Sequence, residues 1–182
     1  MDDFAPPLTY EPASFEQVVL PHRDAAFNLA KWLMHHEQDA EDCVQEAYMR
    51  AFRAWASFRG TDGRSWFLAI VRNLCYSRWR QRQRTDPAVS FDESIHADPA
   101  QGTETAWRHA LARELVPRAL EQLPLEAREI IVLHEIEGLA YKEIAEVIGL
   151  PIGTVMSRLA RARQKLQGEL AQLLKKELPH EL

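Results

Sequence analysis

Two stretches of the sequence combine arginines with hydrogen-bonding or aromatic neighbours, and both could bind a polyanion. Residues 59–84 hold seven basic side chains and one acidic, whereas residues 151–166 hold four basic and none acidic. Basic side chains neutralise phosphates, and aromatic faces stack on unpaired bases at about 1–3 kcal/mol per base. The net charge of −5 does not oppose this, because screening confines each charge to about 8–10 Å. Solvated helix faces are the alternative interpretation.

The second stretch divides into two faces if a helix begins near Gly153. The expected core face consists of Val155, Leu159, Ala162 and Leu166. The other face holds no acid and several hydrogen-bond donors, as a helix in the DNA major groove requires. Its candidate DNA contacts are Thr154, Met156, Ser157, Arg158, Arg161 and Lys165. The alternative is an ordinary amphipathic helix with a basic face.

The residues just before this helix predict a helix-turn-helix. Ala145 supplies a small side chain where two helices nearly touch, and Gly149, four residues later, suits a turn that needs positive φ. A further helix is expected from Pro124, with Glu126 and Glu129 favoured by its dipole. Gly138 should end that helix. Its expected buried residues are Ile130, Ile131, Leu133 and Ile136.

The first basic stretch interleaves arginines with aromatics and suits single-stranded or melting DNA better than an intact duplex. Residues 58–64 are expected to form a loop, and Ser65 should cap the helix that follows. Phe67 is expected in the core. Trp66 is open to either interpretation, a core residue or a base-stacking one.

An earlier helix is predicted to begin at the N-cap candidate Asp39. Its expected apolar stripe is Val44, Ala47, Tyr48, Ala51, Phe52 and Trp55. Its opposite face is polar and carries Asp42, Gln45, Glu46, Met49 and Arg53. A polar face of this kind is available to a partner or to solvent.

Composition limits the remaining classes of protein. The two cysteines, Cys43 and Cys75, support neither a disulfide framework nor a four-thiolate zinc site, which makes a reduced cytoplasmic location the expectation. No charge-free stretch exceeds eleven residues, and the N-terminus has no basic segment, so we expect no membrane insertion and no secretory signal. Residues 85–107 carry five acids, two prolines and no Lys or Arg, and predict a flexible linker.

Three features in this order resemble a sigma factor of bacterial RNA polymerase, of the extracytoplasmic-function (ECF) subfamily in the sigma-70 family. They are the acidic-aromatic segment 39–48, Phe58-Arg59-Gly60 followed by residues 66–73, and Leu123-Pro124 followed by residues 153–163. The resemblance implies an all-α fold of two modules, a sigma-2-like helical bundle and a sigma-4-like helix-turn-helix bundle. The boundaries that we expect are a tail (1–13), a polymerase- and −10-binding domain (14–84), the acidic linker (85–107) and a −35-binding domain (108–178).

The resemblance also implies a role for each candidate residue. The polymerase clamp helices would be bound by Asp39, Asp42, Gln45, Glu46 and Met49. The −10 element would be bound by Arg59, Arg64, Trp66, Arg72, Asn73, Arg78 and Arg80. In the −35 set, Ser157 and Arg161 would contact bases and Arg158 a phosphate. The implied partners are core RNA polymerase, through its clamp helices and flap, promoter DNA, and an anti-sigma factor, which could be membrane-bound. The implied role is to initiate transcription of a stress or envelope-response regulon.

Two other classes of function are considered. A stand-alone helix-turn-helix regulator with a helical sensor domain would bind duplex DNA without polymerase; residues 39–52 and the arginine-aromatic stretch argue against it. A metal enzyme would use His35, His36 and Cys43, but adjacent histidines point to different sides of a helix and no ligand spacing is present. We therefore expect no enzymatic activity, no metal and no cofactor.

Overall fold

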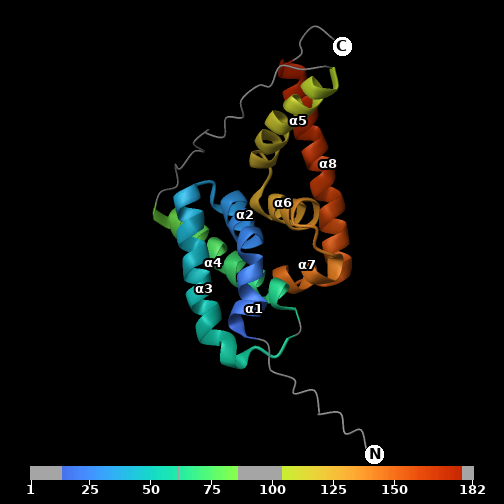
Figure 1. Ribbon diagram of the computed structural model, residues 1–182. Coiled ribbons are helices and arrows are strands. Elements are labelled where there is room, and N and C mark those ends of the chain that lie inside the picture. The colour runs from blue at the N-terminus through green and yellow to red at the C-terminus, as the bar shows by residue number, and fades with distance from the viewer. Residues whose placement is uncertain (1–13, 61, 86–103, 178–182) are drawn as a thin grey trace, which may run out of the picture.

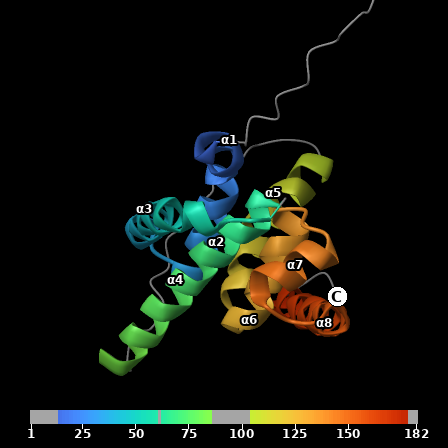
Figure 2. The same ribbon diagram turned by 90° about the horizontal axis from the view of Figure 1, so that it is seen from below.

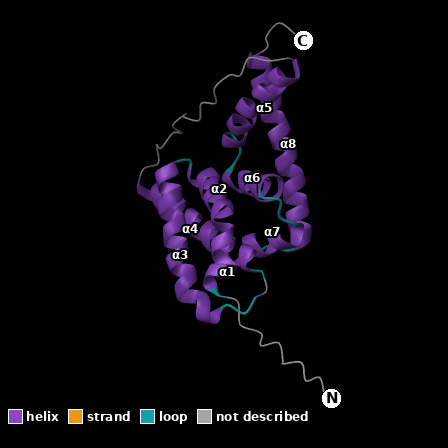
Figure 3. Cartoon of the chain, in the orientation of Figure 1, coloured by secondary structure: helices purple, strands orange, loops and turns teal. Residues whose placement is uncertain are grey.

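The computed structural model describes residues 14–60, 62–85 and 104–177, and the regular elements within these ranges are all helices (Figure 3). The expected all-α class is therefore confirmed. The tail 1–13 and residues 86–103 of the expected linker lie outside the described residues, as do residues 178–182. The helices form two groups, an N-terminal and a C-terminal module, which lie side by side (Figure 1).

The N-terminal module is a bundle in which α2, α3 and α4 pack pairwise. Its elements are α1 (Phe15–Val19), the 3₁₀ helix η1 (Leu20–His22), α2 (Arg23–Met34), α3 (Glu37–Ala54), the 3₁₀ helix η2 (Trp55–Ser57) and α4 (Gly63–Thr85). Its core is apolar and includes Leu29, Leu33, Ala47 and Phe67, each almost fully buried. Phe67 thus lies where the sequence placed it.

The C-terminal module is built around a helix-turn-helix. Its elements are α5 (Glu104–Glu121), α6 (Leu125–Ile131), the π-helix η3 (Val132–Ile136), α7 (Tyr141–Ile148) and α8 (Ile152–Glu177). Helix α8 runs along both α5 and α6 (Figure 1). Gly149 has φ 69° at the end of α7, and Gly138 has φ 68° just after η3. Both glycines therefore end helices with positive φ, as the spacing predicts.

Two predicted helix starts are wrong. α2 ends at Met34, its C-cap His35 has φ 63°, and α3 starts at Glu37, so Asp39 lies in the first turn of α3 instead of at its N-cap. α4 begins at Gly63, and the backbone N–H of Ser65 donates to Asp62 Oδ1 at 3.1 Å. Asp62 therefore plays the capping role expected of Ser65, because its carboxylate reaches a free N–H of the first turn.

Two residues predicted to be buried are exposed. Phe52 on α3 is 64% exposed, and its ring packs edge to face with that of Phe15, with 5.4 Å between the ring centroids. Ile136 is 45% exposed at the end of η3. The wider π-helical turn changes the angle between successive side chains, so an α-helical spacing misplaces a residue at its end.

The two modules contact each other along the length of the N-terminal bundle. α4 packs against α7, and α2 packs against α6 and η3 (Figure 2). Residues that meet there are separated by dozens of positions in the sequence. This contact determines which side chains of α4 face solvent and which face the other module.

Gly63 generates a stability prediction. A Cβ atom at this position would overlap Val18 Cγ1 and lie 2.8 Å from the Val18 carbonyl oxygen, which belongs to the backbone. We expect Gly63→Ala to lower the free energy of unfolding by about 1–3 kcal/mol, because α1 must move. Thermal unfolding followed by circular dichroism measures this.

The matched control is Gly168→Ala in α8, where an added Cβ meets no atom within 4 Å. There alanine should stabilise the helix by about 0.5–1 kcal/mol. A Gly63→Ala protein as stable as the wild type would contradict the close approach of α1 and α4.

Candidate functional site

The candidate −35 residues lie on an open face of α8. Val155, Leu159 and Ala162 are buried, as the two-face division predicts. Met156, Ser157, Arg161 and Lys165 are exposed, whereas Thr154 and Arg158 are partly buried. Their intramolecular contacts are weak or local: Arg161 Nε donates to the Ser157 carbonyl at 3.2 Å, and Arg158 Nη1 lies 3.7 Å from Glu126 Oε2. This face thus presents donors to solvent from one rigid helix.

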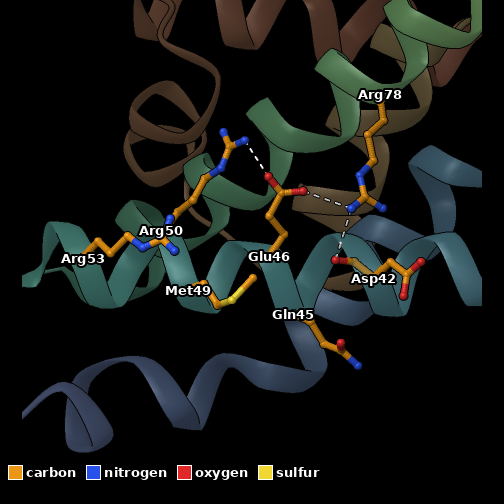
Figure 4. A pocket seen from close by; sticks show the side chains of 7 residues that line it. All are labelled: Asp42, Gln45, Glu46, Met49, Arg50, Arg53 and Arg78. Carbon is orange, nitrogen blue, oxygen red and sulfur yellow. Dashed lines mark hydrogen bonds and ion pairs between the residues drawn. The ribbon is translucent and has the colours of Figure 1, made fainter.

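The candidate polymerase residues lie along one side of α3, where most of them line an open hollow of about 420 Å³ (Figure 4). Its lining residues are Asp42, Gln45, Glu46, Met49, Arg50, Arg53 and Arg78. Glu46 accepts hydrogen bonds from Arg50 Nη2 at 2.6 Å and from Arg78 Nη2 at 3.0 Å. These arginines lower the pKa of the Glu46 carboxyl, the Arg78 hydrogen bond having the largest effect.

Asp39, the fifth candidate on this side, pairs with Arg82 across the α3–α4 contact. Met49 is 54% exposed beside the hollow. Phe52, one turn farther along α3, continues the same exposed side and was missed because the sequence analysis counted it with the buried stripe. The helical spacing could have predicted this, because Gln45, Met49 and Phe52 are spaced i, i+4, i+7 and therefore lie on one side of the helix.

The seven candidate −10 residues do not share one surface. Those exposed are Arg59, Asn73 and Arg80. Arg78 turns toward α3, where it bonds Glu46. Trp66 is partly buried against Phe58, at 4.7 Å between ring centroids, and so belongs to an aromatic cluster of the N-terminal module. The remaining two, Arg64 and Arg72, face the C-terminal module.

Arg72 binds a buried carboxylate of the C-terminal module. Its Nε lies 2.6 Å from Glu129 Oε1 and its Nη2 3.4 Å from Glu129 Oε2. Tyr76 donates its hydroxyl to the same Oε2 at 3.0 Å, and the Arg72 guanidinium lies 4.3 Å from the centroid of the Tyr76 ring. Burial raises the pKa of Glu129, which Arg72 and Tyr76 oppose; burial and the Glu129 carboxylate raise the pKa of Tyr76.

Arg64 makes a second contact of this kind. Its Nη2 donates to the Glu137 carbonyl at 2.6 Å and lies 3.5 Å from the Glu137 carboxylate. Asn28 of α2 donates to the same carboxylate at 3.1 Å. Glu137 follows η3, so the π-helical turn positions it at the module boundary.

Arg128, the neighbour of Glu129, joins the ends of two helices. Its guanidinium donates to the carbonyls of Leu120, Glu121 and Leu123, each at 2.8 Å, at the C-terminal end of α5. It also donates to the Trp32 carbonyl near the end of α2 at 3.0 Å and contacts His35 Nε2. A cation is favoured at helix C-termini, where carbonyls lack partners. Burial lowers the pKa of Arg128 to about 10.

The contacts that Arg128, Glu129 and Glu137 make at the module boundary were not predicted from the sequence. Glu129 was expected only to suit the helix dipole, whereas the residue is buried, with 2% of its surface exposed. One signal was available: residues 130–133 are uniformly apolar, and a helix that is apolar on all sides must be covered on more than one. The pairing of Glu129 with Arg72, 57 positions away, cannot be predicted from the residues around either one.

The residues considered for a metal enzyme have other surroundings. His35 contacts Arg128, and Cys43 Sγ lies 3.2 Å from Cys75 Sγ in the core of the N-terminal module. Within the described ranges, no group of three or more His, Cys, Asp or Glu side chains is arranged to hold a metal ion. In the same ranges, no helix is long and apolar enough to span a bilayer.

Comparison with known families assigns both modules. Residues 18–85 match the family Sigma-70 region 2, and residues 113–166 match the family Sigma-70, region 4. The first match covers most of the N-terminal bundle, and the second contains the helix-turn-helix.

Individual relatives agree. The chain is 34% identical over 161 residues to the ECF RNA polymerase sigma factor SigE of Mycolicibacterium smegmatis, covering 87% of this chain but only 62% of that protein. It is 33% identical over 171 residues to the RNA polymerase sigma-H factor of Pseudomonas aeruginosa, covering 89% of each. Among solved structures, the sigma factor RpoE in complex with the anti-sigma factor NepR from Bartonella quintana aligns with a TM-score of 0.70 at 34% identity, over 86% of this chain and 96% of that one.

His35 generates a pH prediction. Burial, and then the charge of Arg128, lower the pKa of His35 from 6.5 to about 4. Between pH 6.5 and 4 the unfolded chain therefore binds more protons at this residue than the folded chain, so stability is lost as the pH falls through this window. The contribution of His35 is complete above pH 6.5.

The measurement compares urea unfolding at pH 7.5 and pH 5.0. His35→Asn, which keeps a residue tolerant of positive φ but cannot titrate, should lose less stability on acidification than the wild type. His36→Asn changes the exposed neighbour, whose charge adds least to the lowering of the His35 pKa, and should lose nearly as much stability on acidification as the wild type. Equal acid sensitivity of wild type and His35→Asn would refute the assignment.

Proposed function

Since this chain belongs to the sigma-70 family and, within it, to the ECF sigma factors, we propose that it binds core RNA polymerase, recognises −10 and −35 promoter elements and initiates transcription. The observation that carries the proposal is the face of α8. It presents Ser157, Arg161 and Lys165 to solvent from a segment, residues 151–168, that contains no acidic residue and follows a turn closed by Gly149. Such a face fits the major groove.

We assign polymerase and −10 binding to the N-terminal module and −35 binding to the C-terminal module. Residues 14–84 hold polymerase through the α3 side and bind the −10 element, residues 108–178 bind the −35 element, and residues 85–107 link them. On α4, the exposed Asn73 and Arg80 support the −10 role, together with Arg59 in the loop before it. The acidic composition of the linker suits passage through a basic channel.

Control by an anti-sigma factor is part of the proposal. The Bartonella quintana RpoE structure contains such a partner, NepR. In this chain, the basic face of α8 and the exposed Met49 and Phe52 of α3 offer surfaces that an anti-sigma factor could cover. The chain would act in the cytoplasm, where polymerase is, as a binding factor without catalysis of its own.

Transcription in vitro tests the proposed function directly. Core polymerase is combined with this chain on a library of promoters, and initiation sites are mapped. We expect initiation at a subset that shares −10 and −35 sequences. Absence of initiation, together with failure to bind core polymerase, would contradict the proposal.

Arg161 generates a prediction about −35 selectivity. Arg161→Ala should cost about 1–3 kcal/mol of promoter affinity and relax selectivity at one −35 position, because an arginine can form two parallel bonds to guanine. Holoenzyme footprinting over altered −35 sequences measures both effects. The control is Arg163→Ala, since the Arg163 guanidinium already pairs with Glu135 at 2.5 Å. Unchanged selectivity in Arg161→Ala would count against the assignment.

Asp42 generates a prediction about polymerase binding. Asp42→Lys should weaken binding to core polymerase roughly tenfold or more, because it places a like charge against a complementary surface. Asp42 is a cleaner choice than Glu46, whose reversal would also break the Arg50 and Arg78 pairs. Glu41→Lys makes the same charge change at an exposed residue about 100° around the helix and serves as control. Equal polymerase affinity of the two variants and the wild type would refute the role of Asp42.

A further inference from the structure

Two of the proposed −10 arginines already contact acidic residues of the other module. Arg72 binds Glu129, and Arg64 binds Glu137. A guanidinium whose fork is closed by a carboxylate cannot at the same time bind a phosphate with the same donors. The docked arrangement of the modules therefore keeps a phosphate away from the Nε and Nη2 donors of Arg72, and it engages one nitrogen of Arg64.

The surroundings of Glu129 have the form of an anion site. Its carboxylate receives hydrogen bonds from Arg72 Nε and Nη2 and from the Tyr76 hydroxyl, all from neighbouring turns of α4. Three donors converging from one helix, backed by the Tyr76 ring against Arg72, suit any compact oxyanion. A phosphodiester group offers the same acceptor geometry as the carboxylate.

The size of the molecule also indicates that the modules separate when both proposed promoter elements are bound. A compact chain of 182 residues has a radius of gyration of about 16 Å, so it is roughly 40 Å across. Positions −10 and −35 of a duplex are about 85 Å apart, at 3.4 Å per base pair. The docked chain cannot reach both, so the modules must separate when both elements are bound.

The chemistry of the interface suits a contact that opens. A buried ion pair returns little net stability, because desolvation offsets most of the attraction. Glu129 and Arg128 are both 2% exposed, and their partners Arg72, Tyr76 and Trp32 lie across the boundary. These charged contacts therefore specify one docked arrangement and themselves add little net stability to it.

We propose that Arg72 and Tyr76 form a phosphodiester-binding site for single-stranded DNA, which Glu129 fills when the modules are docked. The inference rests on the proposed function, since the ligand is the melted promoter strand. Glu129 is thus a competitor in cis: promoter strand gains access to α4 only as the C-terminal module withdraws. The exposed Asn73, in the next position to Arg72, would be the first contact.

The test measures binding of the full-length chain, without polymerase, to a fluorescein-labelled single-stranded DNA of 20 nucleotides. Glu129→Gln keeps the shape but removes the charge that holds Arg72, and we expect it to bind roughly tenfold more tightly than the wild type, with a steeper salt dependence. Adding Arg72→Gln to this variant should abolish the gain. The control Glu41→Gln removes the same charge from an exposed acid on α3, away from both Arg72 and Arg158, and should bind like the wild type.

Glu137→Gln opens the second contact and covers the case in which Glu129→Gln does not fold. The change removes the 3.5 Å ion pair with Arg64 but keeps the bond from Arg64 to the Glu137 carbonyl, so we expect a smaller increase in affinity. The inference is overturned if the folded variants bind no more tightly than Glu41→Gln, or if Arg72→Gln leaves the gain of Glu129→Gln intact. Initiation with core polymerase is assayed on the same wild-type preparation, so that a failure of the proposed function appears separately from a failure of the masked site.

Discussion

The structure depends on two neighbouring charged residues, Arg128 and Glu129, that are buried between two helical modules. Arg128 satisfies carbonyls at the ends of α5 and α2, and Glu129 receives Arg72 and Tyr76 from α4. If either charge stayed buried without its partners, the folded state would lose several kcal/mol of stability. The docked position of one module on the other is therefore fixed by hydrogen-bond geometry as well as by apolar packing.

This contact divides the binding surfaces into two kinds. The α3 side with Asp42 and Met49, and the α8 face with Ser157 and Arg161, remain open to partners in the docked chain. The side of α4 with Arg72 does not, because Glu129 covers it. Polymerase and an anti-sigma factor could thus meet the chain in its docked form, whereas melted DNA requires a rearrangement. Binding of a protein partner would then precede binding of melted DNA, because only the second requires the modules to separate.

Local patterns predicted the fold well, and long-range pairings could not be predicted. The alternation between Val155 or Leu159 and Ser157 or Arg161 depends only on helical periodicity, so the two faces of α8 were predicted correctly. Arg72 and Glu129 are 57 positions apart, and no local rule pairs them. Five arginines of this stretch (Arg59, Arg64, Arg72, Arg78 and Arg80) were therefore predicted together as −10 contacts, although tertiary contacts divide them among solvent, Glu46, Glu129 and Glu137.

The most direct test of a docked chain that separates on promoter DNA is a distance between the modules by pulsed electron paramagnetic resonance. Spin labels are placed at Glu41→Cys on α3 and Ala171→Cys on α8, both exposed, while the native Cys43 and Cys75 are buried. We expect one narrow distance distribution in the free chain and a clearly longer distance in the complex with core polymerase and promoter. A broad distribution in the free chain, or the same distance in both states, would contradict the account.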